Sequence, residues 1–244
     1  MGLISLLASC ATSSSERTPT PTPQDDRNLI QRVTENLPIS QPTPKNELVY
    51  RGPIEHTISA GSFLPGTPIK YVGLTADKTA EVQINGQRAF KRVSDSLDWT
   101  GTPVANVNVQ LSDRVLWFGE QQLQLLGTIR LTVNGVAPKR DTIPPIPKQP
   151  TPSFLVYKVP VVYRVKRGDT IPGTTLTYVG KTENGAELGG LPKDEYAYRQ
   201  VGDSIAWQGQ LRSQVYLDLL LRTTVYDDQT LNVTGLATLI LPKS

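Results

Sequence analysis

The stretches GSFLPGTPIKYVG (Gly61 to Gly73) and GDTIPGTTLTYVG (Gly168 to Gly180) are two versions of one segment, 107 positions apart. The resemblance continues downstream at a separation of 108 positions, so one residue has been inserted between the two blocks. The downstream part is carried by Asp95 and Asp203, Ser96 and Ser204, Trp99 and Trp207, and Gly127 and Gly235. Self-similarity at a fixed separation is typical of a duplicated folding unit. The sequence therefore predicts two tandem copies of one module, over residues 48–136 and 156–244.

Apolar and polar side chains alternate within each copy with a period of two. The clearest apolar series are Leu123, Leu125, Ile129, Leu131 and Val133 in the first copy and Leu231, Val233, Ala237, Leu239 and Leu241 in the second. Such alternation is typical of strands with one buried and one solvated face. Hairpin signals such as Asn85-Gly86 and Asn184-Gly185 separate the segments. The pattern predicts an all-β protein in which each copy is a β-sandwich or a small β-barrel of about six to eight strands.

A glycine interrupts the last apolar series of each copy, at Gly127 and Gly235. Glycine inside a strand indicates a bend, a bulge or the close approach of a bulky group. We expect Trp99 and Trp207 to be that group and to plug the two cores.

The upstream ends of the copies are less alike. Val49-Tyr50-Arg51 resembles Val162-Tyr163-Arg164, and this alignment predicts a longer connection in the first copy, which would contain His56. Between the copies, residues 137–155 are rich in proline, which cannot donate to a β-ladder, and they predict an interdomain linker.

Composition limits the possible functions. The 244 residues include 20 Pro, 19 Gly and one Met, which suits a turn-rich extracytoplasmic β-protein. A net charge of +3, with cations scattered among acids, argues against nucleic-acid binding. The single Cys and single His exclude an intrachain disulfide and a Cys/His zinc cage. We expect no metal and no cofactor.

The Asp-Ser pairs 95–96 and 203–204 are the candidates for chemistry. A serine nucleophile needs an oriented base, and the second copy has no histidine. We therefore interpret the aspartates as acceptors of turn hydrogen bonds. The alternative is a hydrolase of envelope polymer that uses these pairs or His56.

Two further features are candidate binding elements. The Pro-Gly-Thr blocks at 65–67 and 172–174 resemble ligand loops, but Pro followed by Gly favours a type II turn. Tyr196 and Tyr198 form a candidate binding surface for a peptide or a glycan, with half-buried strand aromatics as the competing interpretation.

The N-terminal residues 1–10 end in Leu7-Ala8-Ser9-Cys10. This segment resembles the lipobox of bacterial lipoproteins, in which the cysteine becomes the acylated first residue of the mature protein and anchors it to a membrane. The apolar run before Cys10 is shorter than a usual signal and lacks Lys and Arg, so we expect a truncated signal whose true start lies upstream. Ala11, in place of Asp, favours the outer membrane within that family.

Residues 11–47 are rich in Ser, Thr and Pro and predict a disordered tether. A short helix is possible over residues 28–37, where Ile30, Val33 and Leu37 share one helical face. Together these features predict a non-enzymatic lipoprotein on the periplasmic face of the outer membrane or on the cell surface. Its two modules would bind or scaffold a protein or glycan of the envelope, and a surface carbohydrate-binding protein is a further alternative.

Overall fold

The computed structural model describes residues 46–144 and 154–242. Every regular element in these ranges is a β-strand, which confirms the all-β class. The same ranges contain no helix that could span a membrane. The predictions for Cys10 and for the helix over 28–37 lie outside the described residues, as does the predicted tether up to residue 45. The strands are β1 (Glu47–Ser59), β2 (Ile69–Leu74), β3 (Ala80–Ile84), β4 (Gln87–Lys91), β5 (Ser96–Val104), β6 (Val107–Phe118), β7 (Gln122–Asn134), β8 (Lys139–Arg140), β9 (Phe154–Lys166), β10 (Thr177–Thr182), β11 (Gly185–Gly189), β12 (Tyr198–Arg199), β13 (Ser204–Arg212), β14 (Val215–Tyr226) and β15 (Thr230–Pro242).

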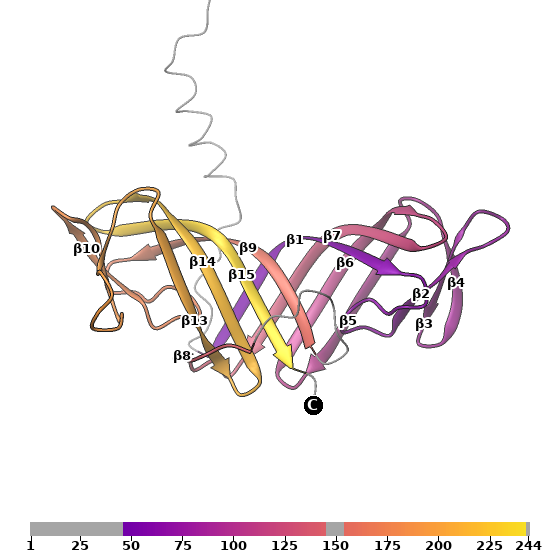
Figure 1. The fold of residues 1–244 in the computed structure, drawn as a ribbon, viewed down its shortest axis with the longest axis horizontal. Coiled ribbons are helices and arrows are strands. Elements are labelled where there is room, and N and C mark those ends of the chain that lie inside the picture. The colour runs from indigo at the N-terminus through magenta and orange to yellow at the C-terminus, as the bar shows by residue number, and fades with distance from the viewer. Residues whose placement is uncertain (1–45, 145–153, 243–244) are drawn as a thin grey trace, which may run out of the picture. The chain divides into compact units, whose positions relative to one another are not determined.

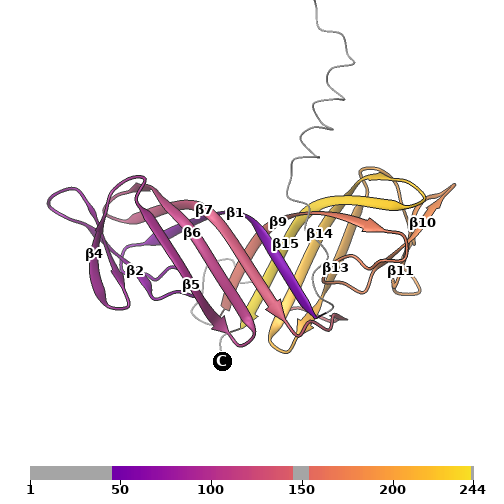
Figure 2. The same ribbon diagram turned by 180° about the vertical axis from the view of Figure 1, so that it is seen from behind.

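The strands form two modules with the same internal order. Module 1 (β1 to β7) has a four-stranded sheet in the order β1-β7-β6-β5 and a small sheet β2-β3-β4 (Figures 1 and 2). Module 2 (β9 to β15) repeats this with β9-β15-β14-β13 and β10-β11-β12. All pairings between these strands are antiparallel, an arrangement that commonly has one face packed on the core and one face in solvent.

The register corrects the upstream alignment of the two copies. Tyr50 lies opposite Leu131 in module 1, and Tyr157 lies opposite Leu239 in module 2. β1 and β9 are both thirteen residues long, so the first copy has no longer connection. The predicted position of His56 was therefore wrong. His56 lies inside β1, at the place that Tyr163 takes in β9.

The tyrosine of the repeated Tyr-Val-Gly sequence forms an equivalent hydrogen bond in both modules. The hydroxyl of Tyr71 donates a hydrogen bond of 2.5 Å to the carbonyl oxygen of Gly119, in the β6–β7 loop. In module 2 the hydroxyl of Tyr178 donates to the carbonyl oxygen of Asp227 in the equivalent loop. Each tyrosine thus joins the small sheet to the end of the long sheet.

The Pro-Gly-Thr blocks are turns. The amide of Thr67 donates to the carbonyl oxygen of Leu64 at 3.0 Å, and Gly66 has a φ of +78°. Gly173 has a φ of +79° and closes the same turn in module 2. Positive φ at the third position is what a type II turn requires, so this prediction is confirmed.

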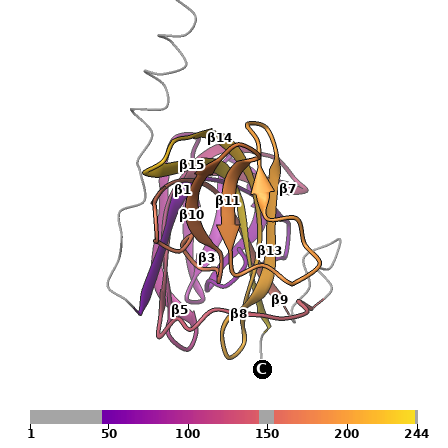
Figure 3. The ribbon, with the colours of Figure 1, turned by 90° about the vertical axis from the view of Figure 1, so that its left-hand side faces the viewer.

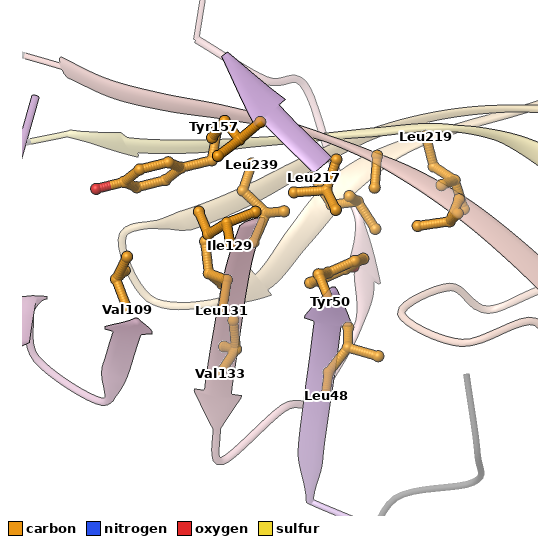
Figure 4. Close-up of a cluster of buried hydrophobic side chains, with 14 of the residues drawn as sticks. Leu48, Tyr50, Val109, Ile129, Leu131, Val133, Tyr157, Leu217, Leu219 and Leu239 are labelled. Carbon is orange, nitrogen blue, oxygen red and sulfur yellow. The ribbon is translucent and has the colours of Figure 1, made fainter. Parts of the chain in front are cut away.

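The modules share one hydrophobic core. A Cβ on Gly173 of module 2 would lie 2.8 Å from a Leu48 methyl and 3.0 Å from the Tyr50 hydroxyl of β1. Reciprocally, a Cβ on Gly66 of module 1 would lie 2.5 Å from the Tyr157 hydroxyl of β9. Figure 4 shows the buried side chains that β1, β6, β7, β9, β14 and β15 contribute to this cluster. The turns that were weighed as ligand loops therefore cover the junction between the modules.

Part of the predicted linker belongs to a sheet. In β8, Arg140 lies opposite Gly209 and Lys139 lies opposite Gln210, so β8 adds a fifth strand beside β13 (Figure 3). The last two residues of the predicted linker, 154–155, are the first two of β9.

Candidate functional site

The two aspartates of the Asp-Ser pairs are acceptors of backbone hydrogen bonds. The amide of Arg92 donates to Asp95 Oδ2 at 2.7 Å, and the amide of Gln200 donates to Asp203 Oδ2 at 2.7 Å. Each carboxylate closes the turn that leads into β5 or β13. A carboxylate used in this way holds the turn and does not face a serine hydroxyl as a base.

In module 1, Ser96 faces away from His56, the single histidine of the chain. Ser96 is exposed and lies opposite Arg114, whereas the next pair along the two strands, Leu97 and Asp113, is buried. Successive side chains of a strand point to opposite faces. Ser96 is therefore on the solvent face of the sheet, and His56 is on the core face with Asp113.

Ser204 has the same setting in module 2. It is exposed and lies opposite Arg222, whose Nη1 donates to the carbonyl oxygen of Gly202 at 2.9 Å. The geometry thus gives neither serine a base among the described residues.

The tryptophans pack over glycines of their own strands. Trp207 is buried, and its ring lies where a Cβ on Gly209 would lie, 2.6 Å from the nearest ring carbon. Its Nε1 donates to Thr175 Oγ1 at 3.1 Å. Trp99 covers Gly101 in the same way but is only half-buried.

The expectation that the tryptophans cover Gly127 and Gly235 was therefore wrong. A Cβ on Gly127 would overlap the carbonyl oxygen of Ser112 and the carboxylate of Asp113, and a Cβ on Gly235 would overlap the carbonyl oxygen of Leu220. The group that approaches each glycine is the neighbouring strand itself. Neither glycine is bulged, because both pair in regular register.

A buried ionisable pair occupies the space over Gly127. His56 on β1 reaches across β7 toward Asp113 on β6, and His56 Nε2 lies 3.8 Å from Asp113 Oδ2. This distance exceeds a hydrogen bond. Neither that nitrogen nor either carboxylate oxygen has a hydrogen-bond partner among the described residues. Asp113 is 0 % exposed, so the His56–Asp113 pair places a carboxyl group inside the core of module 1.

Burial shifts both groups of the pair toward their neutral forms. Desolvation raises the pKa of Asp113 to about 6, with a smaller contribution from the charge of Asp98, and desolvation lowers the pKa of His56 to about 4. In module 2 the equivalent positions hold Tyr163 and Leu221, which bring no charge. The pair is thus a feature of module 1 alone, and it could not be predicted because its members are far apart in the chain.

The predicted aromatic surface lies on module 2. Tyr196 is 65 % exposed, and its ring meets that of Tyr198 edge-on, with 5.4 Å between the centroids. Glu195, next to Tyr196, accepts from Arg140 Nη1 and from Arg199 Nη2, both at 3.1 Å. This cluster fixes the loop that presents the exposed ring.

A hollow of about 540 Å³ lies beside this loop. It is lined by Arg140, Asp141, Thr142, Glu195, Ala206, Trp207 and Gln208. Arg140 Nε and Nη2 have no hydrogen-bond partner among the described residues, although both atoms are inaccessible to solvent in this conformation. The hollow and the two tyrosines are called the Tyr196 surface below.

Metal binding finds no support in the described ranges, since no three residues of the types His, Cys, Asp and Glu cluster there. Comparisons of the chain with protein-family models, with curated proteins and with solved structures found no match.

Proposed function

We propose that this chain is a non-enzymatic lipoprotein of a bacterial envelope that binds or scaffolds another envelope component through the Tyr196 surface. The observation that carries the proposal is the exposed Tyr196 ring beside a hollow that is lined by polar and charged side chains, among them Arg140, Glu195 and Gln208. Aromatic rings next to a few polar groups in a concave site are typical of binding sites. Tyrosine also supplies contact area at a small loss of conformational entropy.

The anchor in this proposal is Cys10, which would carry acyl chains after processing. Two or more acyl chains hold a protein stably on a membrane, whereas one gives only marginal binding. A coil of the length of residues 11–47 reaches roughly 35 Å from its attachment point. The modules would then contact a component at that distance from the bilayer, a protein or a glycan.

Palmitate labelling tests the anchor. The full-length chain should incorporate labelled palmitate, and the Cys10→Ser variant should not. Equal labelling of the two would remove the lipoprotein part of the proposal.

Paired variants test the Tyr196 surface. Capture from detergent-solubilised envelopes should enrich a component with the native chain that is lost with the Tyr196→Ala, Tyr198→Ala variant. Phe90, which holds the place of Tyr198 in module 1 and is 56 % exposed, gives the matched control Phe90→Ala. Retention of the component by the tyrosine variant, or its loss from both, would reject the assignment. A glycan partner would in addition change the tyrosine and tryptophan fluorescence when wall oligosaccharides are added.

A further inference from the structure

Two arginines face each other on the solvent side of the long sheet of module 1. Arg51 on β1 lies directly opposite Arg130 on β7, and Gln110 on β6 lies next in the same row. Like charges directly opposite on one face of a sheet destabilise it. Neither arginine forms an ion pair with any other residue that the structure describes.

The groups around this arginine pair form a concave set of hydrogen-bond donors. A hollow of about 530 Å³ is lined by Arg51, Gly52, Pro53, Gln110, Ser112, Thr128, Ile129 and Arg130. Its side chains offer two guanidinium groups, one amide and two hydroxyls. Guanidinium groups bind phosphate oxygens through paired, charge-assisted hydrogen bonds. Of the acids on this face, Glu55 lies opposite Leu126, which does not line the hollow, whereas Asp98 lies opposite Ser112, at the end of the row that Ser112 shares with Thr128; neither acid is in the row of the two arginines.

Module 2 shows what the same row looks like when its charges are balanced. Lys158 lies opposite Thr238, and Thr238 lies opposite Asp218. The row of module 2 thus has one cation, Lys158, and one carboxylate, Asp218, where the row of module 1 has two cations and the amide of Gln110. Gln208 donates to that carboxylate at 3.1 Å, which completes the row without a ligand. Because the two copies share the strand order of the long sheet, this row can be compared between them position by position.

We infer that the hollow lined by Arg51, Arg130 and Gln110 binds a phosphate group, carried by a soluble molecule or by an anionic lipid headgroup. A phosphate would neutralise the two opposed guanidinium groups and accept from Ser112 and Thr128. This site is on module 1 and does not depend on the function proposed for the Tyr196 surface.

Titration calorimetry of the full chain with inorganic pyrophosphate is the first test. Saturable binding is expected, and Arg130→Thr, which installs the residue of module 2, should weaken it about tenfold or more. Lys158→Thr removes the same charge from the equivalent row and should change the affinity less than about twofold. Equal weakening by both variants would show that only the net charge matters and would overturn the inference.

A second variant and a second probe complete the design. Gln110→Asp installs the carboxylate of module 2 beside Arg130 and should weaken binding by a similar factor, so the inference stays testable if Arg130→Thr does not fold. Vesicles that contain phosphatidylglycerol, compared with phosphatidylcholine vesicles, distinguish a lipid headgroup from a soluble phosphate. If the native chain binds neither pyrophosphate nor phosphatidylglycerol vesicles, the inference is wrong.

Discussion

Replacement of Asp113 by asparagine is expected to stabilise the protein at neutral and alkaline pH. The pKa of this buried carboxyl is raised from 3.8 to about 6. One pKa unit corresponds to about 1.36 kcal/mol, so the ionised carboxylate destabilises the fold by about 3 kcal/mol at about pH 8. Because the folded pKa lies above the unfolded one, the penalty is absent below pH 3.8 and grows as the pH rises toward about 6.

Urea unfolding, followed by tryptophan fluorescence at about pH 8 and about pH 4, measures this difference. Asparagine has the size of aspartate and stays neutral, so the gain should be about 3 kcal/mol at the higher pH and below about 1 kcal/mol at the lower. Asp77→Asn, in an exposed loop, is the control and should give no difference between the two conditions.

A gain of the same size at both pH values, or no gain at the higher one, would refute this reasoning. The first result would mean that the gain does not come from removing a charge, and the second would mean that the carboxylate has a stabilising partner.

Three further outcomes are expected in the same unfolding experiments. The native fold should lose about 3 kcal/mol as the pH falls from 6.5 toward about 4, because burial lowers the pKa of the His56 imidazole. The His56→Tyr variant lacks this loss and should therefore become more stable relative to the native chain over that range. A difference between the two proteins that does not change with pH would contradict this. Gly66→Ala should destabilise the fold by more than Gly86→Ala does. No atom lies near a Cβ at Gly86, so the Gly86→Ala variant measures the cost of positive φ alone, about 1–2 kcal/mol. Trp207→Ala should cost about 3–5 kcal/mol and Trp99→Ala less, because only Trp207 is fully buried; equal losses would argue against this difference.

The sequence predicted the features that depend on short-range patterns. Alternation of period two predicted the all-β class, and the Pro-Gly pair predicted the positive φ at Gly66 and Gly173. Asn85-Gly86 is the hairpin turn between β3 and β4, with positive φ at both residues. These features are predictable because backbone sterics within a few residues decide them.

The alignment of β1 with β9 failed because the local resemblance was stronger at the wrong tyrosine. Val162-Tyr163-Arg164 repeats the letters of Val49-Tyr50-Arg51, but both strands end two residues before the glycine that starts the quoted block. Counting back from Gly61 and Gly168 pairs Tyr50 with Tyr157. The distance to a fixed turn was a better guide than three matching letters.

The sheet position of β8 could not be predicted from the composition of its segment. Two paired residues between prolines resemble a linker by composition, and only their pairing with β13 reveals the strand.

The His56–Asp113 pair and the Arg51–Arg130 pair could not be predicted, because each depends on strand register. His56 and Asp113 meet over a glycine of a third strand, and the arginines meet only because β1 pairs with β7 residue by residue. No spacing along the chain encodes either contact. The single histidine was visible as a candidate, but its partner was not.

Comparison of the two copies separates the framework from the parts that have diverged. Both copies keep the turn, the loop hydrogen bond of the tyrosine and the mid-strand glycine, which the fold needs. They differ at the arginine row of module 1 and at Tyr196, whose place in module 1 is held by Arg88. A ligand bound in the same way by both modules would need the same side chains in both. The two proposed sites would therefore make different contacts, and a partner with both a phosphate and an aromatic-binding part would gain from using them together.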